Sequence, residues 1–165
     1  MFIYAIDPGP TRSALVIIEG DRLTNFADMA IEEVCIIDTP QLIERVRIAA
    51  LGGTRTRLVV EMIASYGMPV GAEVFETCVT IGRIIEAWKG DPVIRITRNQ
   101  VKQAICHSSR ANDSNIRQAI IDRFGGKDVA IGSKKAPGPL YGVHNDMWAA
   151  IAVGLTYLDS LNCTS

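Results

Sequence analysis

The stretch Phe2-Ile3-Tyr4-Ala5-Ile6-Asp7-Pro8-Gly9 is the most informative part of this sequence. Its five apolar residues in a row are typical of a strand buried on both faces of a sheet. An aspartate follows at the end of the strand, and Pro8-Gly9-Pro10 then turns the chain away. Open α/β sheets bind ligands outside the carboxyl ends of their strands. A carboxylate at this place suits a hard cation such as Mg²⁺, although a turn or capping role explains Asp7 equally well.

Two further acids strengthen the cation hypothesis. Glu61 follows Leu58–Val60, a run of β-formers, as a second predicted strand ends. Asp146 precedes the Ala-rich apolar segment 147–155, which predicts a helix packed on the sheet. Capping alone explains Asp146, since an acid at a helix start gains about 0.3–1 kcal/mol from the helix dipole. Together, two acids at strand ends and one at a helix start resemble the sites that hold two cations around a phosphodiester.

Several segments in this order carry a resemblance to a known family. They are Ala5–Gly9, Val59–Met68, Val101–Ile105, Arg110–Ala119 and Asp146–Ala152. In these segments the chain resembles the RuvC-type Holliday-junction resolvases of the RNase H-like superfamily, most closely the small versions carried by bacteriophages. The resemblance implies an α/β fold with a central mixed five-stranded sheet, its first three strands antiparallel, flanked by helices.

The resemblance also implies an active site. Asp7, Glu61 and Asp146 would be catalytic and would bind Mg²⁺ or Mn²⁺, with two ions per site. RuvC enzymes carry a fourth acid one helical turn before the last one, where this chain has Val143. His144 and Asp113 are therefore candidates for a fourth ligand, although Asp113 lies where cellular RuvC proteins tend to carry a basic residue. Water is a further alternative, because Mg²⁺ usually keeps several waters.

The activity implied is that of a crossover junction endodeoxyribonuclease. A homodimer would bind branched DNA, a four-way junction, and cut two strands of like polarity symmetrically, leaving 5′ phosphate and 3′ hydroxyl ends. In the resemblance, Tyr66 and Met68 lie at the junction centre, where an apolar or aromatic side chain can wedge into DNA. Packing against the helix that follows is the alternative role for both residues.

Net charge hides a division of the chain. The whole sequence carries −1, but residues 1–94 carry −5, residues 95–135 carry +6 and residues 136–165 carry −2. Such asymmetry predicts a polyanion-binding face beside an acidic metal site, whereas an ordinary solvated surface is the alternative. The predicted DNA-binding residues are Arg98, Lys102, Arg110, Lys134 and Lys135. The two lysines lie in a segment rich in Gly and Pro, which predicts a flexible loop suited to phosphate contact.

Length and composition indicate a single domain over residues 1–165, and the resemblance implies that it is an RNase H-like nuclease domain. Hydrophobic residues make up 48% of the 165, which argues against disorder. No signal-peptide pattern and no run of eighteen apolar residues occurs, so we expect a cytoplasmic protein with no membrane partner. The four cysteines are scattered, which predicts neither a disulfide nor a zinc site; Cys35 and Cys78 are expected to be buried.

The remaining segments predict an alternation of strands and helices. Thr39 is expected to cap a helix that begins at Pro40. The long helix 72–89 is expected to bury Val74, Cys78, Ile81, Ile85 and Trp88, and its mid-helix Gly82 suggests close approach of another helix or simple tolerance. The other expected elements are strands at 13–19, 34–37 and 93–96, and helices at 40–50, 98–106, 113–124 and 144–160.

Other functions fit parts of the pattern. Another RNase H-like nuclease, acting on RNA–DNA hybrids, flaps or RNA, would share the acids without needing a dimer. An actin/hexokinase-like nucleotide-binding domain also begins with an aspartate after its first strand, but it needs a Gly-Thr-rich phosphate turn and a second lobe. A junction-binding protein without activity is weakened by the presence of all three acids.

Overall fold

The computed structural model describes residues 1–20, 29–64, 67, 69–90 and 92–162. The predicted junction-centre residues Tyr66 and Met68 lie outside this part of the chain. The elements are β1 (Phe2–Asp7), β2 (Arg12–Glu19), β3 (Ala30–Asp38), α1 (Thr39–Ala49), the 3₁₀ helix η2 (Ala50–Arg55), β4 (Thr56–Met62), α2 (Ala72–Ala87), β5 (Ile94–Thr97), α3 (Arg98–Cys106), α4 (Asp113–Arg123), α5 (Lys127–Ala130), β6 (Gly132–Ser133), β7 (Ala136–Pro137) and α6 (Met147–Asn162).

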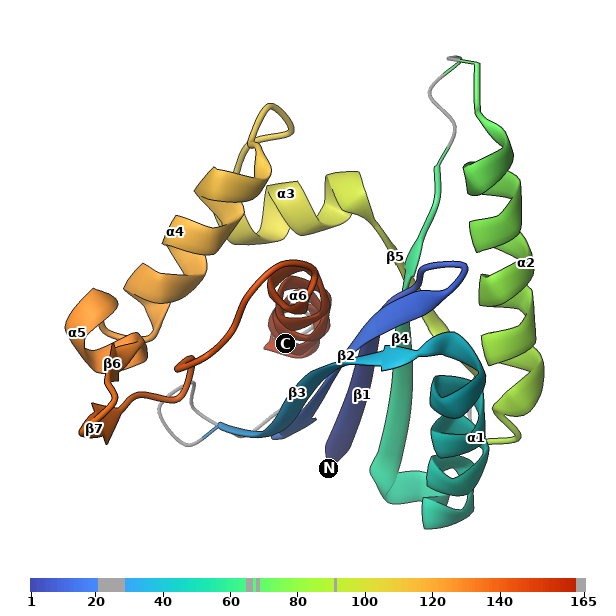
Figure 1. The fold of residues 1–165 in the computed structure, drawn as a ribbon, viewed down its shortest axis with the longest axis horizontal. Helices are drawn as coiled ribbons and strands as arrows, with labels where there is room; N and C mark the ends of the chain where they lie inside the picture. Colours follow the sequence, from blue (N-terminus) through green and yellow to red (C-terminus); the bar gives the residue numbers. More distant parts are fainter. Residues whose placement is uncertain (21–28, 65–66, 68, 91, 163–165) are drawn as a thin grey trace.

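The main sheet has five strands in the order β3-β2-β1-β4-β5 (Figure 1). β1, β2 and β3 pair antiparallel, and β4 and β5 then add in parallel. β1 therefore lies at the centre of the sheet, and its residues Ile3, Ala5 and Ile6 are fully buried. The predicted fold class, a mixed five-stranded sheet that begins with three antiparallel strands, is confirmed.

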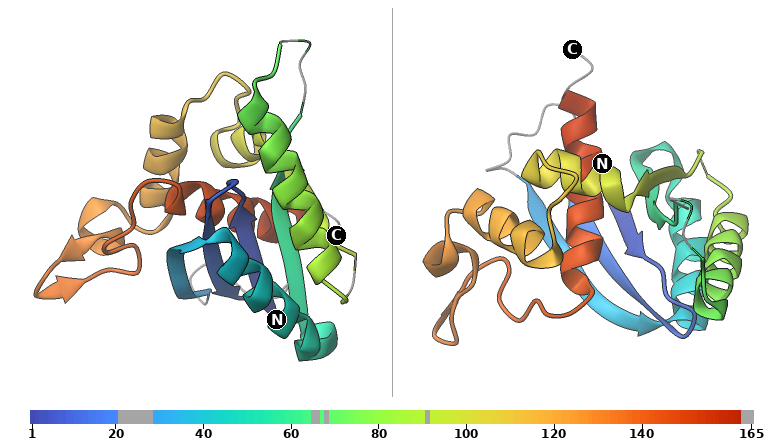
Figure 2. Two further views of the ribbon diagram at one scale, coloured as in Figure 1. Left: turned by 45° about the vertical axis from the view of Figure 1, so that its right-hand side comes forward. Right: turned by 90° about the horizontal axis from the view of Figure 1, so that it is seen from above.

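Helices cover both faces of this sheet (Figures 1 and 2). Because side chains alternate along a strand, Ile3 and Ala5 of β1 face one core while Ile6 faces the other. The first core also holds residues of α3, α4 and α6. The second core holds residues of α1 and α2. Buried strands on both faces explain why β1 and β4 are apolar without alternation.

Helix α6 lies directly against the sheet. Gly154 makes this approach possible, because a Cβ there would lie 2.6 Å from Ile18 Cδ1 and 3.2 Å from Ala5 Cβ. Ten residues of the helix, from Trp148 to Leu158, are buried. A helix that is apolar on nearly all sides is typical of one enclosed by other elements, and α6 lies between the sheet and α3 with α4 (Figure 2).

Two predicted helix starts differ from the structure. The last helix begins at Met147 rather than at residue 144, because Gly142 and Asn145 have positive φ angles of 81° and 48°, which a right-handed helix excludes. Thr39 is the first residue of α1 rather than its cap. Its hydroxyl instead donates to the carbonyl of Gly9 at 2.8 Å, which ties the helix to the turn after Asp7.

The predicted flexible loop around the two lysines is a small hairpin. Ser133 pairs with Ala136, so that Lys134 and Lys135 form the turn between β6 and β7. Gly132 has a φ of 67°, and a Cβ at this position would lie 2.3 Å from the Ala136 carbonyl oxygen. The hairpin therefore depends on a glycine. Both lysines are exposed, and the hairpin extends from the body of the protein on the side away from α2 (Figure 1).

Helix α2 buries most of the predicted face: Ile81 and Trp88 are buried, and Val74 and Ile85 are half-buried. The helix also buries Thr80, Ile84 and Ala87, which were not predicted. Cys78 is exposed and Cys35 is half-buried, so neither thiol is buried as predicted. Phe75 and Val79 are 61% and 59% exposed, and a Cβ on Gly82 would meet no atom within 4 Å. The outer face of α2 is therefore an apolar stripe without a neighbour among the described residues.

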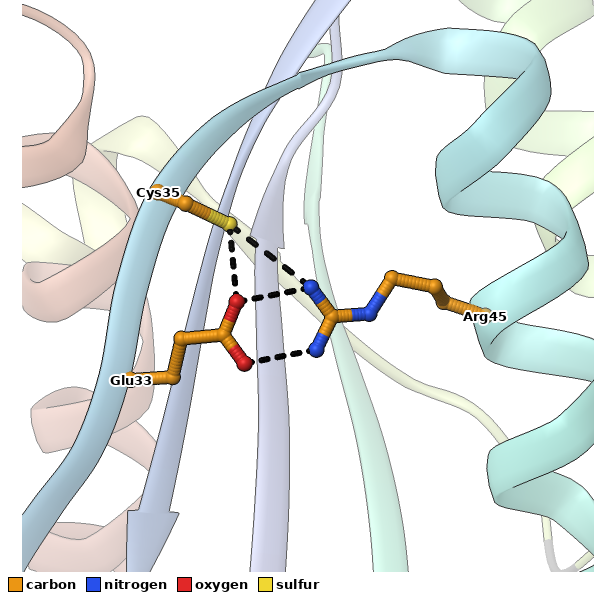
Figure 3. A network of polar contacts seen from close by, with 3 residues as sticks. All are labelled: Glu33, Cys35 and Arg45. Carbon is orange, nitrogen blue, oxygen red and sulfur yellow. Dashed lines mark hydrogen bonds and ion pairs between the residues drawn. The ribbon is translucent and has the colours of Figure 1, made fainter.

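An ion pair joins β3 to α1. The Arg45 guanidinium donates to both carboxylate oxygens of Glu33, at 2.7 and 2.6 Å, and Cys35 Sγ lies beside them (Figure 3). These hydrogen bonds hold the pKa of Glu33 below its ordinary value. The side chains of Arg45 and Glu33 are 34% and 40% exposed. Water therefore screens the ion pair, which contributes about 1 kcal/mol or less to the stability of the fold.

Within the described residues, no helix is long and apolar enough to cross a membrane.

Candidate functional site

The register of the central strands places two of the predicted acids side by side. β1 and β4 run parallel with Ile6 opposite Val60, so the next residues, Asp7 and Glu61, are neighbours across the strands. Adjacent strands lie about 4.8 Å apart. Asp7 follows Ile3 and Ala5 with a period of two, and Glu61 follows Val59. Both carboxylates therefore lie on the face that α6 covers.

Helix α6 brings the third acid to the same place. Asp146 directly precedes this helix, and its carbonyl accepts the first helical hydrogen bonds, from Ala149 at 3.0 Å and Ala150 at 3.1 Å. The left-handed conformation of Asn145 turns the chain into the helix. Because α6 packs on β1 and β2, the start of the helix lies at the carboxyl end of β1. Asp146 thus has the N-cap position that its sequence context predicted.

The three acids line one cavity of about 200 Å³. Arg98, at the start of α3, and Asp113, at the start of α4, also line it. The complete lining is Asp7, Glu61, Arg98, Asp113, Ile116, Asn145, Asp146, Trp148 and Ala149. Residues from five elements therefore meet at the carboxyl ends of the strands, which is where the sequence predicted a ligand.

Larger hollows lie elsewhere in the described part of the chain. One of about 650 Å³ is lined by residues at the start of β1 and the end of α1, among them Phe2, Tyr4 and Arg45. A second, of about 550 Å³, lies between α3 and α4. A third, of about 570 Å³, lies between α1 and α2, where the acids are paired with bases. Size alone therefore does not locate the site. We place it in the smaller cavity because that cavity gathers acids from separate elements.

Burial and crowding disfavour the charged forms of the two sheet carboxylates. The pKa of Asp7 is raised to about 7, first by burial and then by the negative charges of Glu61 and Asp146. Burial also raises the pKa of Glu61. Arg98 opposes both shifts. Because the ionised forms of Asp7 and Glu61 are unfavourable here, a bound cation would stabilise them. Carboxylate oxygens suit Mg²⁺ or Mn²⁺.

Arg98 already lies among these acids. Its guanidinium is 3.6 Å from Glu61 Oε2 and forms a second ion pair with Asp113. Among the described residues, no group of three or more His, Cys, Asp or Glu side chains has the geometry to hold a metal ion as it stands. The donor types fit a divalent cation, and Arg98 lies where it offsets part of their charge.

The two candidates for a fourth ligand lie in different places. Asp113 lines the cavity. His144 is exposed, and among the described residues it is not part of that lining. Its Nδ1 lies 2.8 Å from the Gly142 carbonyl oxygen, which assigns the ring proton to Nδ1 because a carbonyl can only accept. Proximity therefore favours Asp113, and the ligand role of either residue stays a prediction.

The predicted DNA-binding residues form two groups. Arg98 and Lys102 lie one helical turn apart on α3, with Lys102 half-buried, and Arg110 is exposed in the connection to α4. Lys134 and Lys135 lie apart from them at the tip of the hairpin. Arg98 lines the carboxylate cavity, whereas Arg110 lines the hollow between α3 and α4. Their contact with DNA stays a prediction.

Two contributors to the cavity were not recognised from sequence. Asn145 was not singled out, although an Asn before a predicted helix start is a common site for left-handed backbone. Trp148 lies in the apolar segment 147–155 that was expected to pack on the sheet, and it is only 8% exposed, but it also lines the cavity. The Arg117 guanidinium lies 5.1 Å from its ring centroid, within the range of a cation–π contact.

Comparisons with known proteins identify the fold. No protein-family model matches the sequence, and no curated protein matches it either. Among solved structures, Thermus thermophilus RuvC in complex with a Holliday junction substrate aligns with a TM-score of 0.68 at 16% identity, covering 99% of this chain and 96% of that one. This chain has the RuvC fold.

Two more structures agree with this assignment. A second structure of Thermus thermophilus RuvC aligns with a TM-score of 0.63 at 18% identity, covering 99% of this chain and 95% of that one. The fowlpox virus resolvase in complex with Holliday junction DNA aligns with a TM-score of 0.52 at 16% identity, covering 96% and 99%. The alignments span nearly the whole chain, so the likeness extends over the entire fold rather than over one part of it.

The raised pKa of Asp7 predicts how stability depends on pH. An acid whose folded pKa lies above its unfolded value stabilises the protein below the unfolded pKa, and that stability is lost as pH rises through the folded pKa. For Asp7 the window runs from about pH 4 to about pH 7. We expect the metal-free Asp7→Asn variant to match the wild type near pH 4 and to exceed it by up to about 4 kcal/mol at pH 8. Urea denaturation at several pH values measures this difference, and parallel profiles of the two proteins would contradict it.

Proposed function

We propose that this protein is a metal-dependent endonuclease that resolves four-way DNA junctions. The observation that carries the proposal is the meeting of Asp7, Glu61 and Asp146 on one cavity at the carboxyl ends of the strands. The RuvC fold supports it, because two proteins with this fold have been captured with Holliday junction DNA. The cuts would be paired and symmetric, leaving 5′ phosphate and 3′ hydroxyl ends. We also propose that the protein is encoded by a bacteriophage.

The acids would hold the cations and the cavity would shape the reaction. Asp7 and Glu61 would bind from the sheet, and Asp146 from the start of α6. Mg²⁺ or Mn²⁺ bound there, two ions per site, would supply an activated water and neutralise charge on the leaving oxygen. The rigid strand pairing would keep both sheet carboxylates in place. Asp146, on a separate element, would close the site from the other side.

Basic side chains would bind the DNA backbone. Lys102, on the helix that begins with Arg98, and Arg110, in the connection between α3 and α4, would position the strand to be cut. Lys134 and Lys135 extend on their hairpin and would contact phosphates farther along an arm of the junction (Figure 1). Contacts to phosphates carry no sequence information. Recognition would therefore rest on the shape of the branched DNA.

A homodimer would present two such sites to one junction. The stripe on α2 formed by Phe75, Val79 and Gly82 is proposed as the contact between the subunits. Exposed apolar patches of this kind mark interaction sites, and Gly82 would allow two helices to approach closely. A second copy suits the stripe, because two paired cuts of like polarity require two sites related by a twofold axis.

Another RNase H-like nuclease is the alternative function. An enzyme that cuts RNA–DNA hybrids or flaps would use the same acids, and the carboxylate cavity does not distinguish the substrates. A panel of a synthetic four-way junction, a hybrid duplex and a flap, each with and without Mg²⁺, separates these functions. Cutting of the hybrid in preference to the junction would replace our proposal with the alternative.

Amide substitutions test the metal chemistry. Asp7→Asn, Glu61→Gln and Asp146→Asn each keep the shape of the side chain and remove the charge that binds a cation. We expect each to lower junction cleavage by at least about a thousandfold, a loss comparable to that of other essential electrostatic groups, while junction binding in Ca²⁺ persists. Glu44→Gln, an exposed acid of α1, is the control and should cleave normally. Normal cleavage by Asp146→Asn would remove Asp146 from the site.

The salt dependence of binding tests the hairpin. Each phosphate neutralised by the protein contributes about −0.9 to the log–log slope of affinity against salt. Replacing Lys134 and Lys135 together by alanine should flatten the slope by up to about two units and weaken all junction sequences alike. Binding is measured in Ca²⁺ so that nothing is cut. Arg47 and Lys89, exposed bases of α1 and of the segment after α2, form the matched control pair. An unchanged slope would place the hairpin away from DNA.

Solution mass tests the proposed subunit contact. We expect the wild type to sediment as a dimer and the variant Phe75→Asp with Val79→Asp to sediment as a monomer, because the contact would bury four unpaired charges. Ile48→Asp is the control, since Ile48 is an equally exposed apolar residue, 67% exposed, on helix α1. A dimer that survives both changes on α2 would show that the subunits meet elsewhere.

A further inference from the structure

Arg98 makes contact with two carboxylates that differ in their surroundings. Glu61 is part of the carboxylate cavity and its side chain is 14% exposed, whereas the side chain of Asp113 is 83% exposed at the rim. The guanidinium of Arg98 lies between them, 3.6 Å from Glu61 and in direct ion-pair contact with Asp113. The Arg98 guanidinium therefore links a carboxylate inside the cavity to one at its edge.

Two capping motifs fix this arrangement. Arg98 is the first residue of α3, and Thr97 with Gln100 forms a capping box at that helix start. Asp113 is the first residue of α4, and Asn112 with Asn115 forms a second capping box there. Such boxes hold the first turn of a helix in place. The two helix starts thus present Arg98 and Asp113 to each other without depending on any ligand.

The charge of Arg98 affects any cation that enters the cavity. It offsets the mutual repulsion of the acids, and it lowers the pKa of Asp7 and of Glu61. A fixed positive charge about 4 Å from a carboxylate also competes with a metal ion for that carboxylate. The pull of Asp113 toward the rim limits this competition, because it keeps the guanidinium from settling fully on Glu61.

We propose that Arg98 is a built-in counter-cation of the carboxylate cavity, and that Asp113 is a positioning residue that holds Arg98 at the rim rather than a fourth metal ligand. This inference rests on the proposed function, since it assumes that the cavity binds a divalent cation. The inference gives a role to Asp113, which the sequence left as a candidate for the fourth metal ligand. Arg98 would therefore serve the cavity before it served DNA. To bind a phosphate, its guanidinium would have to break its ion pair with Glu61 or with Asp113.

A double-mutant cycle on metal binding tests the proposal without DNA and without activity. Mn²⁺ is titrated by calorimetry into the wild type, Arg98→Gln, Asp113→Asn and the double variant, at pH 8.5, where the acids are ionised. Arg98→Gln removes the competing charge and should tighten Mn²⁺ binding by about tenfold. Asp113→Asn releases Arg98 toward Glu61 and should weaken binding several-fold. In the Arg98→Gln background, Asp113→Asn should have little effect, since no guanidinium remains to be held.

Two further variants separate these effects from general damage. Asp113→Glu keeps the carboxylate and should restore Mn²⁺ affinity, which a merely structural role for Asp113 would not require. The pair Arg123–Asp159 joins α4 to α6 and is a matched control, because the Arg123 side chain is 30% exposed and that of Arg98 is 31% exposed. Arg123→Gln should leave Mn²⁺ affinity unchanged. Arg98→Lys, which keeps the charge, provides a second test if Arg98→Gln fails to fold, and it should retain the affinity of the wild type within a few fold.

The outcomes that overturn the inference are distinct. Asp113→Asn weakening Mn²⁺ binding equally in both backgrounds would make Asp113 a ligand. Unchanged or weaker binding in Arg98→Gln, or tenfold tighter binding in Arg98→Lys, would remove Arg98 as a counter-cation while leaving the proposed nuclease intact. A wild-type protein that binds no Mn²⁺ would overturn both this inference and the metal dependence on which it rests.

Discussion

The parallel, in-register pairing of β1 with β4 sets the distance between Asp7 and Glu61, and the rest of the site is arranged around that pair. Neighbouring strands bring their side chains within about 5 Å of each other. Burial disfavours the charged form of Asp7, and two acids at this spacing also repel each other, which is why the pKa of Asp7 rises to about 7. A protein keeps such a pair only where the surrounding structure determines it and a positive charge relieves it.

Close packing of α6 on the sheet brings the third acid to this pair. Gly154 packs against the side chains of Ala5 and Ile18, so the helix approaches the sheet closely because it has no side chain of its own at this point. Asp146 directly precedes the same helix, and its carbonyl accepts hydrogen bonds from the first turn. The position of the third acid is therefore tied to the packing of α6 on the sheet.

Positive charge is arranged at two distances from the acids. Arg98 lies inside the cavity rim and is engaged by Glu61 and Asp113. Lys134 and Lys135 lie on an exposed hairpin well away from α2 (Figure 1). The charge division seen along the sequence therefore does not correspond to one uniform basic face. The near charge balances the acids of the protein, and the far charges are available to a polyanion.

The sequence by itself determined the sheet, the strand-end acids and most helices, because buried apolar runs, turn residues and capping patterns act locally. Asp7 and Glu61 were recognisable for that reason. Only the tertiary structure decided that Asp113 pairs with Arg98, since the two residues come from separate helices. It also decided that α2 buries Ile84 and exposes Cys78, because the face of a mostly apolar helix depends on what lies against it. The structure likewise decided that α6 begins only at Met147, because Asn145 adopts a left-handed backbone directly before the helix.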